Sequence, residues 1–319
     1  MEGSGKLVVV TPVYEDADTA RRLFQELALQ FHRGVFVVAV DDGSIREPLG
    51  VDGLQAAGLD GVVLRLRRNV GHQKAIAVGL SYVAENSPSD AITIVMDSDG
   101  EDVPSTIPDL LRRLEPGDVD VAVAKRLSRV ETMRFKLFYS IYKRFFRFIT
   151  GRQISFGNFM AMKSHGVRRL TAMPELSIHV ASAVLASKLR IALCPIRRGA
   201  RYAGQSKMNF VGLVLHGFKG LMVFAEDVLV RVGLAAAVVG ALSVAGGVLA
   251  IVLKTIGYST PGWFSVAMGI LVLMFMQTGA LSLMTLMLTG VVRSGAVASP
   301  QSYREFVEDV LHANPEAGL

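Results

Sequence analysis

The chain has 319 residues, of which 51% are hydrophobic and 19% charged, and its formal net charge is +6. This composition excludes an intrinsically disordered chain and a basic tail of the kind that binds nucleic acid. The charge is unevenly spread: residues 1–124 hold 11 basic and 20 acidic residues, residues 125–227 hold 19 basic and four acidic, and the rest is balanced. The sequence therefore divides into an acidic, a basic and a neutral part.

Short β-branched runs alternate with helical patterns in the first part. We predict strands over Leu7–Val10, Val35–Val40, Val62–Leu66, Ala91–Met96 and Val119–Ala124, and helices over Asp18–Phe31, His72–Glu85 and Ser105–Leu114. Such alternation is typical of an α/β fold in which helices cover a mostly parallel sheet.

Polar residues follow four consecutive predicted strands. These segments are Thr11–Asp16, Asp41–Ser44, Arg68–Lys74 and Asp97–Asp102. In open parallel sheets, ligands bind beyond the carboxyl ends of the strands. We therefore expect these acids, an amide and a cation to form a site at one edge of the sheet.

The last of these segments is dense in acids, because Asp97, Asp99, Glu101 and Asp102 place four carboxylates within six residues. Their mutual repulsion is costly unless a cation offsets it. Oxygen ligands with no cysteine nearby indicate Mg²⁺ or Mn²⁺, and a metal that bridges a diphosphate stabilises it as a leaving group. The alternative is an acidic, solvated loop or a helix cap, since Asp102 stands near the start of a predicted helix.

The other polar segments also have ordinary structural explanations. Asp41 and Asp42 end a strand before a glycine that suits a tight turn, and Asn69 belongs to a strand-to-helix turn. Lys74, in the first turn of the next predicted helix, lies near a phosphate or is solvated. We expect His72 to be incidental.

Several motifs occur in a fixed order: Pro12-Val13-Tyr14, Asp41-Asp42-Gly43-Ser44, Asn69-x-Gly71, Asp97-x-Asp99 and Arg126. Together they resemble the family-2 glycosyltransferases, whose soluble domain has the Rossmann-like GT-A nucleotide-sugar fold, and the resemblance runs from Leu7 to about Asn209. It is strongest to the polyprenyl-phosphate glycosyltransferases of the dolichyl-phosphate mannose synthase type. The resemblance implies an inverting, metal-dependent hexosyltransferase that moves a sugar from a UDP- or GDP-sugar to polyprenyl phosphate.

The resemblance also implies roles for individual residues. The nucleotide sugar would be bound by Pro12, Tyr14, Asp16, Asp41, Asp42, Ser44, Asn69, Lys74, Asp97, Arg201, Ser206 and Lys207. The metal would be held by Asp97, Asp99 and Glu101, and catalytic roles would fall to Asp99, Asp102 and Arg126. The acceptor would be bound by Arg126, Lys136, Ser140 and Asn158. A phosphate acceptor is largely dianionic at neutral pH, so no strong catalytic base is expected.

The chain departs from the family pattern at three places. Glu15 and Asp16 stand where relatives usually have Asn and then Glu, and Glu101 stands where they often have Gln. Lys136 stands where relatives have the arginine that binds the acceptor phosphate. A lysine cannot make the bidentate contact that an arginine makes. The added charge of Glu101 would alter the choice or the affinity of the metal.

The basic part contains two distinct stretches. Residues 125–152 hold nine basic residues, one acid and many apolar ones, which predicts a basic amphipathic helix on an anionic membrane surface. Nucleic-acid binding is the rival use of such a stretch, but two membrane spans in the same chain favour lipid. The stretch Lys188–Lys219 includes Arg197–Asn209, which resembles the family's flexible loop that closes over the donor diphosphate. The alternative is a basic linker beside the membrane, and both roles can hold at once.

The neutral part lacks charges from Val232 to Leu253 and from Thr255 to Val292. A bilayer core needs about 20 apolar residues, so we predict two transmembrane helices rather than buried soluble ones. We expect residues 1–207 to form the GT-A domain, 208–227 an interfacial helix, 228–292 the spans and 293–319 a cytoplasmic tail. The basic residues before the first span place the catalytic domain and both termini in the cytoplasm, at a bacterial inner membrane.

Three further expectations concern disulfides, assembly and alternative functions. The single Cys194 cannot form an intrachain disulfide. The first residues lack the apolar core of a secretory signal. Glycines in the first span permit a homo-oligomer. A processive polysaccharide synthase is a second enzyme hypothesis, but such enzymes usually carry Gln-x-x-Arg-Trp and the only tryptophan here is Trp263. A non-catalytic membrane scaffold is a third, against which the intact Asp97 and Asp99 count.

Overall fold

A computed structural model of the chain describes residues 6–32, 34–115, 117–126, 144, 146–153, 156–203, 210–258, 260–296, 302–315 and 319. The chain forms two compact units. The first, which we call the sheet unit, consists of Met1–Ile141, Gln153–Val223 and Pro300–Leu319. The second, the hairpin unit, consists of Tyr142–Arg152 and Phe224–Ser299.

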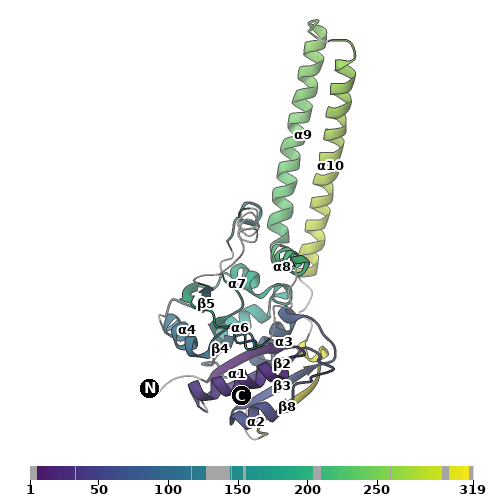
Figure 1. Cartoon of the computed structure of the whole chain (residues 1–319). Helices are drawn as coiled ribbons and strands as arrows, with labels where there is room; N and C mark the ends of the chain where they lie inside the picture. Colours follow the sequence, from purple (N-terminus) through teal and green to yellow (C-terminus); the bar gives the residue numbers. More distant parts are fainter. Residues whose placement is uncertain are drawn as a thin grey trace. The chain divides into compact units, whose positions relative to one another are not determined.

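An eight-stranded sheet is the centre of the sheet unit, with the strand order β7-β5-β6-β4-β1-β2-β3-β8. The strands are β1 Leu7–Val13, β2 Val35–Asp41, β3 Asp60–Leu66, β4 Ile92–Val95, β5 Val121–Arg126, β6 Met160–Lys163, β7 Ile191–Ile196 and β8 Val307–His312. Strands β4, β1, β2 and β3 are parallel, whereas β6 and β8 run antiparallel to their neighbours. The mostly parallel α/β sheet predicted from the sequence is confirmed (Figure 1).

Helices cover both faces of the sheet. They are α1 Ala17–Phe31, α2 Asp52–Ala57, α3 His72–Asn86, η1 Pro104–Thr106, α4 Ile107–Leu114, α6 Ser164–Thr171, η2 Pro174–Ser177, α7 Val180–Ala186, α8 Phe210–Met222 and η3 Tyr303–Glu305. The five strands and three helices predicted from periodicity are all present, with ends that differ by a few residues. We did not predict α2, α6, α7, β6, β7 or β8.

Alternation along the buried strands produces two cores. In β1, Val8 and Val10 join a cluster with α3, α6 and α7, whereas Leu7 and Val9 join a cluster with α1 and α4. Successive strand residues point to opposite faces, so a strand that is apolar throughout can fill a core on each side. This explains why the β-branched runs lack an apolar–polar alternation. The polar turns that follow these strands are left at the sheet's edge.

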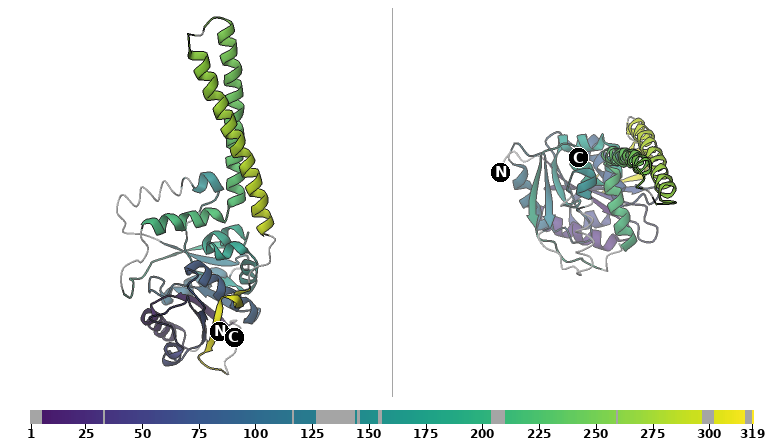
Figure 2. Two further views of the ribbon diagram at one scale, coloured as in Figure 1. Left: turned by 90° about the vertical axis from the view of Figure 1, so that its right-hand side faces the viewer. Right: turned by 90° about the horizontal axis from the view of Figure 1, so that it is seen from above.

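The C-terminal segment adds the eighth strand. Strand β8 pairs antiparallel with β3, from Val62↔His312 to Leu66↔Val307, and is visible as the yellow strand beside β3 (Figure 1 and Figure 2). The backbone N–H of Arg67 donates to the carbonyl of Phe306 at 2.9 Å. The expected cytoplasmic tail of residues 293–319 is therefore not a separate segment, because part of it completes the sheet unit.

The hairpin unit contains two long helices, α9 Ala225–Thr255 and α10 Trp263–Ala296, which pack along each other. Both are long and apolar enough to cross a membrane, and an 18-residue stretch of each has a mean hydropathy of 2.4 in α9 and 1.9 in α10. Leu242, Val248 and Ile270 are exposed, so the pair presents apolar side chains outward. A Cβ atom at Gly233 would lie 2.9 Å from Thr285 Oγ1, which shows how closely the helices approach. The hairpin has the length, composition and apolar surface of two membrane spans.

A pair of histidines joins α8 to α7 in the sheet unit. His179 caps α7, because its Nδ1 accepts the backbone N–H of Ser182 at 3.1 Å. Its Nε2 lies 3.1 Å from Nε2 of His216 on α8. Since Nδ1 acts as an acceptor, the neutral ring carries its proton on Nε2 and donates to His216. Burial, together with the charges of His216 and Lys219, lowers the pKa of His179 to about 3.

This pair predicts a loss of stability in mild acid. Because the pKa of His179 in the fold lies below the value of about 6.5 in an unfolded chain, the unfolded state binds more protons as pH falls from 6.5 toward 3. Stability from neutral His179 is complete above pH 6.5 and decreases by about 2 kcal/mol at pH 5. Thermal unfolding in detergent at pH 8 and pH 5 measures it. The His179→Asn variant, which keeps a helix cap, should show a smaller shift; an unchanged shift would contradict the assignment.

Candidate active site

The acidic turn, residues 97–102, follows β4 and is closed by its own side chains. Asp102 Oδ2 accepts the backbone N–H of Asp97 at 3.0 Å, and Asp99 Oδ1 accepts that of Glu101 at 3.0 Å. Asp102 is 8% exposed, and burial raises its pKa to about 7, with the charges of Asp97 and Asp99 adding to the effect. Asp102, which we predicted to be catalytic, therefore shapes the turn with at least one of its oxygens.

His72, which we expected to be incidental, lies beside two predicted site residues. Its Nε2 is 3.2 Å from Asp97 Oδ1 and 3.1 Å from Asn158 Nδ2. Burial lowers the pKa of His72, but the carboxylates of Asp97, Asp99 and Asp102 outweigh it and the net shift is upward. The sequence contains a signal for this position, because His72 begins the helix that follows a polar turn at the ligand-binding edge.

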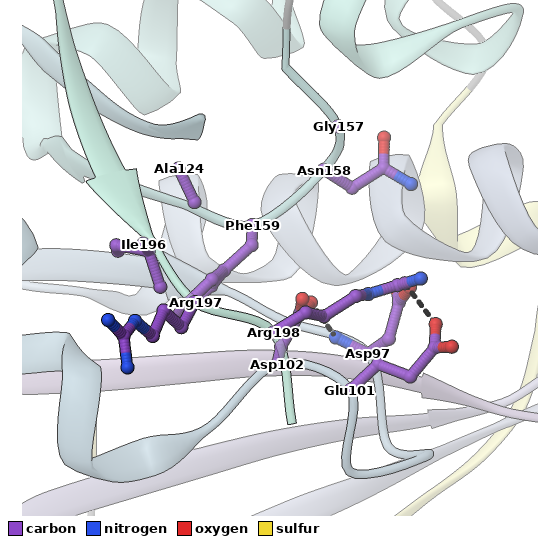
Figure 3. A pocket seen from close by; sticks show the side chains of 10 residues that line it. All are labelled: Asp97, Glu101, Asp102, Ala124, Gly157, Asn158, Phe159, Ile196, Arg197 and Arg198. Atoms are coloured by element: carbon purple, nitrogen blue, oxygen red, sulfur yellow. Dashed lines mark hydrogen bonds and ion pairs between the residues drawn. The ribbon is translucent and has the colours of Figure 1, made fainter. Parts of the chain in front are cut away.

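Two arginines lie against the acidic turn. Arg198 forms an ion pair with Glu101, and Arg201 NH2 lies 2.7 Å from Asp99 Oδ2 and 3.6 Å from Glu101 Oε2. Figure 3 shows Arg198 directed toward the carboxylates and Arg197 directed away from them. Arg201 was predicted as a donor-binding residue; Arg198 was not singled out, although it belongs to the same basic stretch.

The backbone of the arginine segment, residues 197–202, rests directly on the acidic turn. The N–H of Gly199 donates to Glu101 O at 2.9 Å, and the N–H of Tyr202 donates to Asp99 O at 2.9 Å. A Cβ atom on Gly199 would lie 2.5 Å from Gly100 O, and Gly100 itself has φ +86°. Glycine is needed at both positions, because a side chain would hold the two segments apart.

Two pockets adjoin this arrangement. The first, shown in Figure 3, is lined by Asp97, Glu101, Asp102, Ala124, Gly157, Asn158, Phe159, Ile196, Arg197 and Arg198. The second is lined by Pro12, Val13, Tyr14, Asp42, Asn69, Gly71 and His72. Four predicted donor residues thus gather in the second pocket. Asp97, also predicted to bind the donor, and Asn158, predicted on the acceptor side, line the first. Tyr14 is 46% exposed, which leaves its ring available for contact with a ligand.

The two aspartates at the end of β2 accept hydrogen bonds from backbone N–H groups rather than project outward. Asp41 is fully buried, and its two oxygens accept the N–H groups of Ser44 and Leu49, each at 2.9 Å. Asp42 accepts those of Val70 and Gly71 at 2.7 and 3.0 Å, and burial raises its pKa. Asp41 therefore shapes its loop, while Asp42 both lines the second pocket and fixes the turn before α3.

Glu15, the departure from the family pattern, ties two loops together. Its carboxylate accepts the backbone N–H groups of Ile45, Arg46 and Glu47 at 2.9–3.2 Å, and its own N–H donates to Ser44 Oγ at 2.8 Å. The hydrogen bond from Ile45 is the largest cause of its lowered pKa. Ser44, predicted as a nucleotide contact, is one of the groups that position this loop.

The remaining predicted residues are placed differently. Asp16 precedes α1, and its carbonyl accepts the Thr19 hydroxyl at 3.1 Å. The Lys74 ammonium lies 3.9 Å from the ring centroid of Phe306, in the C-terminal segment. Arg126 ends β5 opposite Ile196, and its side chain is not described. The predicted residues Lys136, Ser140, Ser206 and Lys207, and most of the helix predicted over residues 125–152, lie outside the described residues.

The donor set is suited to a divalent cation. Asp97, Asp99 and Glu101 keep 24%, 17% and 20% of their side chains exposed, and all supply carboxylate oxygens. No three-residue metal cage is preformed among the described residues. Mg²⁺ and similar ions are usually bound by one or two carboxylates together with phosphate oxygens of a substrate.

The chain is similar in sequence to known glycosyltransferases. The chain is 25% identical over 256 residues to an undecaprenyl-phosphate 4-deoxy-4-formamido-L-arabinose transferase from Klebsiella pneumoniae, covering 78% of this chain and 76% of the relative. It is 27% identical to the uncharacterized glycosyltransferase YkoT from Bacillus subtilis, over 73% and 69% of the two chains.

The fold has solved counterparts, and the sequence matches a family. Glucosyl-3-phosphoglycerate synthase from Mycobacterium tuberculosis, crystallised with Mn²⁺, UDP-glucose and phosphoglyceric acid, superposes with a TM-score of 0.51 at 15% identity. That similarity covers 70% of this chain and 80% of the other. Residues 8–174, just over half of the chain, match the family described as Glycosyl transferase family 2. The matched residues run from β1 to α6 and include Asp41, Asp42 and the acidic turn. The chain belongs to glycosyl transferase family 2.

Proposed function

We propose that this protein transfers a sugar from a nucleotide-diphospho-sugar to polyprenyl phosphate, with inversion at the anomeric carbon. The observation that carries the proposal is the acidic turn at the carboxyl edge of the sheet, with Arg198 and Arg201 against it, in a chain that also bears a long apolar hairpin. A cation-binding site beside arginines suits a diphosphate, and the hairpin suits an acceptor that resides in a membrane. The undecaprenyl-phosphate transferase from Klebsiella pneumoniae supports the same acceptor class.

The residues divide into a donor side and an acceptor side. Pro12, Tyr14, Asp42 and Asn69 would contact the nucleotide in the second pocket. Mg²⁺ or Mn²⁺ would be held by Asp97, Asp99 and Glu101, and its charge would stabilise the departing diphosphate. An acceptor phosphate oxygen attacks the anomeric carbon from the face opposite the diphosphate, the bond to the diphosphate breaks, and a nucleoside diphosphate leaves. The acceptor is already anionic, so no strong base is required.

The proposal includes an orientation in the membrane. Helices α9 and α10 would span a bacterial inner membrane, and the sheet unit, to which both terminal segments belong, would lie in the cytoplasm. Leu215, Phe218 and Met222 are exposed at three- and four-residue spacing on α8, which is the pattern of an apolar face on an interfacial helix.

A direct assay tests the proposed function. Purified full-length protein is incubated with undecaprenyl phosphate, Mg²⁺ or Mn²⁺ and a panel of UDP- and GDP-sugars, and the lipid products are identified by mass. A polyprenyl phosphate that gains one sugar residue supports the proposal. A polymer would support a processive synthase instead, and the absence of any product with any donor would contradict both hypotheses. Undecaprenol without the phosphate is the control acceptor and should remain unmodified.

Arg201 gives a prediction about metal binding. Its guanidinium neutralises Asp99 and Glu101, two carboxylates that a cation would also use, so it competes with the cation. In Arg201→Gln, Mn²⁺ binding without nucleotide is expected to become about fivefold tighter, since a partly exposed pair contributes about 1 kcal/mol. Transfer should nevertheless fall at least tenfold, because a contact to the diphosphate is lost.

Titration of Mn²⁺ followed by electron paramagnetic resonance measures the affinity. Arg197→Gln is the matched control, because Arg197 points away from the carboxylates (Figure 3) and its replacement should change the affinity less than twofold. Weaker Mn²⁺ binding by Arg201→Gln would show that the arginine does not compete with the metal.

A further inference from the structure

One imidazole stands where the two pockets meet. His72 lines the second pocket, whereas Asp97 and Asn158 line the first. The His72 Nε2 is 3.2 Å from Asp97 Oδ1 and 3.1 Å from the terminal amide of Asn158. A single ring nitrogen therefore contacts a carboxylate of the acidic turn and a side chain from the segment before β6, which are 61 residues apart in sequence.

The chemistry of these neighbours determines the tautomer. An ionised carboxylate only accepts hydrogen bonds, so the Nε2 that faces Asp97 carries a hydrogen. An amide that shares this N–H contacts it through oxygen, and the nitrogen and oxygen of an amide are assigned from the hydrogen-bond network. With the nitrogen and oxygen of this amide exchanged, the Asn158 oxygen would accept the N–H of His72, and its NH₂ group would point away from the imidazole.

The position of the imidazole is itself held firmly. His72 is the first residue of α3 and follows Gly71, which has φ +90°. Asp42, buried beneath the turn, accepts the backbone N–H groups of Val70 and Gly71. The backbone before His72 is thus fixed by two hydrogen bonds to a single carboxylate. The position of the imidazole therefore follows from the turn before α3.

We propose that His72 is a positioning residue that holds Asp97 and Asn158 in register, so that the donor and acceptor sides of the site are aligned by one imidazole. This inference rests on the proposed function. It also gives Asn158 a defined role, because an amide whose oxygen is turned to His72 presents its NH₂ group as a donor for a phosphate oxygen of the acceptor in the first pocket. His72 acts through these two residues and takes no part in bond breaking.

Kinetic separation of the two substrates tests the proposal. In His72→Ala, the KM for undecaprenyl phosphate is expected to rise about tenfold and kcat to fall about tenfold, the range seen when a group that orients active-site ligands is removed. The dissociation constant of the nucleoside diphosphate is expected to rise as well, because His72 lines the second pocket and contacts Asp97. His72→Gln should recover most of the loss, because its amide N–H can donate toward Asp97. His312→Gln, on the exposed face of β8, is the control and should match the wild type.

A double-mutant cycle provides the sharper criterion. If His72 acts through Asn158, the Asn158→Ala change raises the acceptor KM in the wild type but has little further effect in His72→Ala. Independent, multiplicative effects would overturn the proposal, as would a Gln variant as impaired as the Ala variant. The side chain of His72 is 46% exposed, so all variants should unfold at the wild-type temperature. If the wild type transfers no sugar, the proposed function is refuted and this inference with it. If the wild type transfers sugar and His72→Ala has the same kcat and acceptor KM, only the inference is refuted.

Discussion

Asp99→Asn is expected to lower sugar transfer about 10³-fold while the protein remains folded. Asp99 Oδ2 pairs with Arg201 at 2.7 Å, and Oδ1 accepts the N–H of Glu101 at 3.0 Å. Asparagine keeps the size and the acceptor for Glu101 but removes the negative charge that a cation requires. Burial raises the pKa of Asp99, even though the hydrogen bond from Glu101 favours the charged form, so this carboxylate is kept in a poorly solvated place where its charge has a large effect.

Three measurements make this prediction specific. Transfer is followed by lipid-product mass, Mn²⁺ binding by titration, and folding by circular dichroism and thermal unfolding. Asp109→Asn is the matched control, because Asp109 lies on α4, 45% exposed, in a surface pair with Arg112. It should retain full activity. Full activity of Asp99→Asn at saturating Mg²⁺ would show that the acidic turn is a structural loop.

Val307→Asp in β8 is expected to destabilise the sheet unit by about 4 kcal/mol. Val307 is 8% exposed, pairs with Leu66 and belongs to the core on the α3 face. Aspartate there would lose the burial of a valine side chain and would place an unpaired carboxylate in the core. Because typical domains unfold at a cost of 5–15 kcal/mol, a large part of the stability would be lost.

The same strand supplies the control. Glu308 is exposed, so Glu308→Gln should change stability by less than about 0.5 kcal/mol. Thermal unfolding in detergent, monitored by circular dichroism, compares the two variants. Equal unfolding temperatures for Val307→Asp and Glu308→Gln would mean that β8 contributes nothing to the fold. A selective effect of Val307→Asp would show that residues beyond the second span stabilise the sheet unit.

Local patterns in the sequence were sufficient for the central elements. The runs Leu7–Val10 and Val35–Val40 are apolar throughout, and such strands need helices on both faces, which specifies a parallel sheet. The motifs that follow them were correctly expected at one edge of the sheet, because parallel strands end on the same side. The two apolar stretches were equally clear, since their length and lack of charge are local properties.

Other features depend on partners that are distant in sequence. Strand β8 has two acids among its six residues and so lacks the apolar run of the predicted strands, and it forms because β3 leaves an unpaired edge. Asp41 was expected to touch a ligand, yet its oxygens accept backbone N–H groups that only the folded loop brings within reach.

The sequence by itself determined the α/β sheet, the edge at which the polar motifs gather and the apolar hairpin, because periodicity and strand direction follow from neighbouring residues. Only the tertiary structure decided that Arg198 and Arg201 cover the acidic turn, that residues 307–312 complete the sheet and that His72 contacts both Asp97 and Asn158. The physical reason is that a hydrogen bond or an ion pair is set by distances of about 3 Å between side chains, and those distances arise only when separate loops pack against one another.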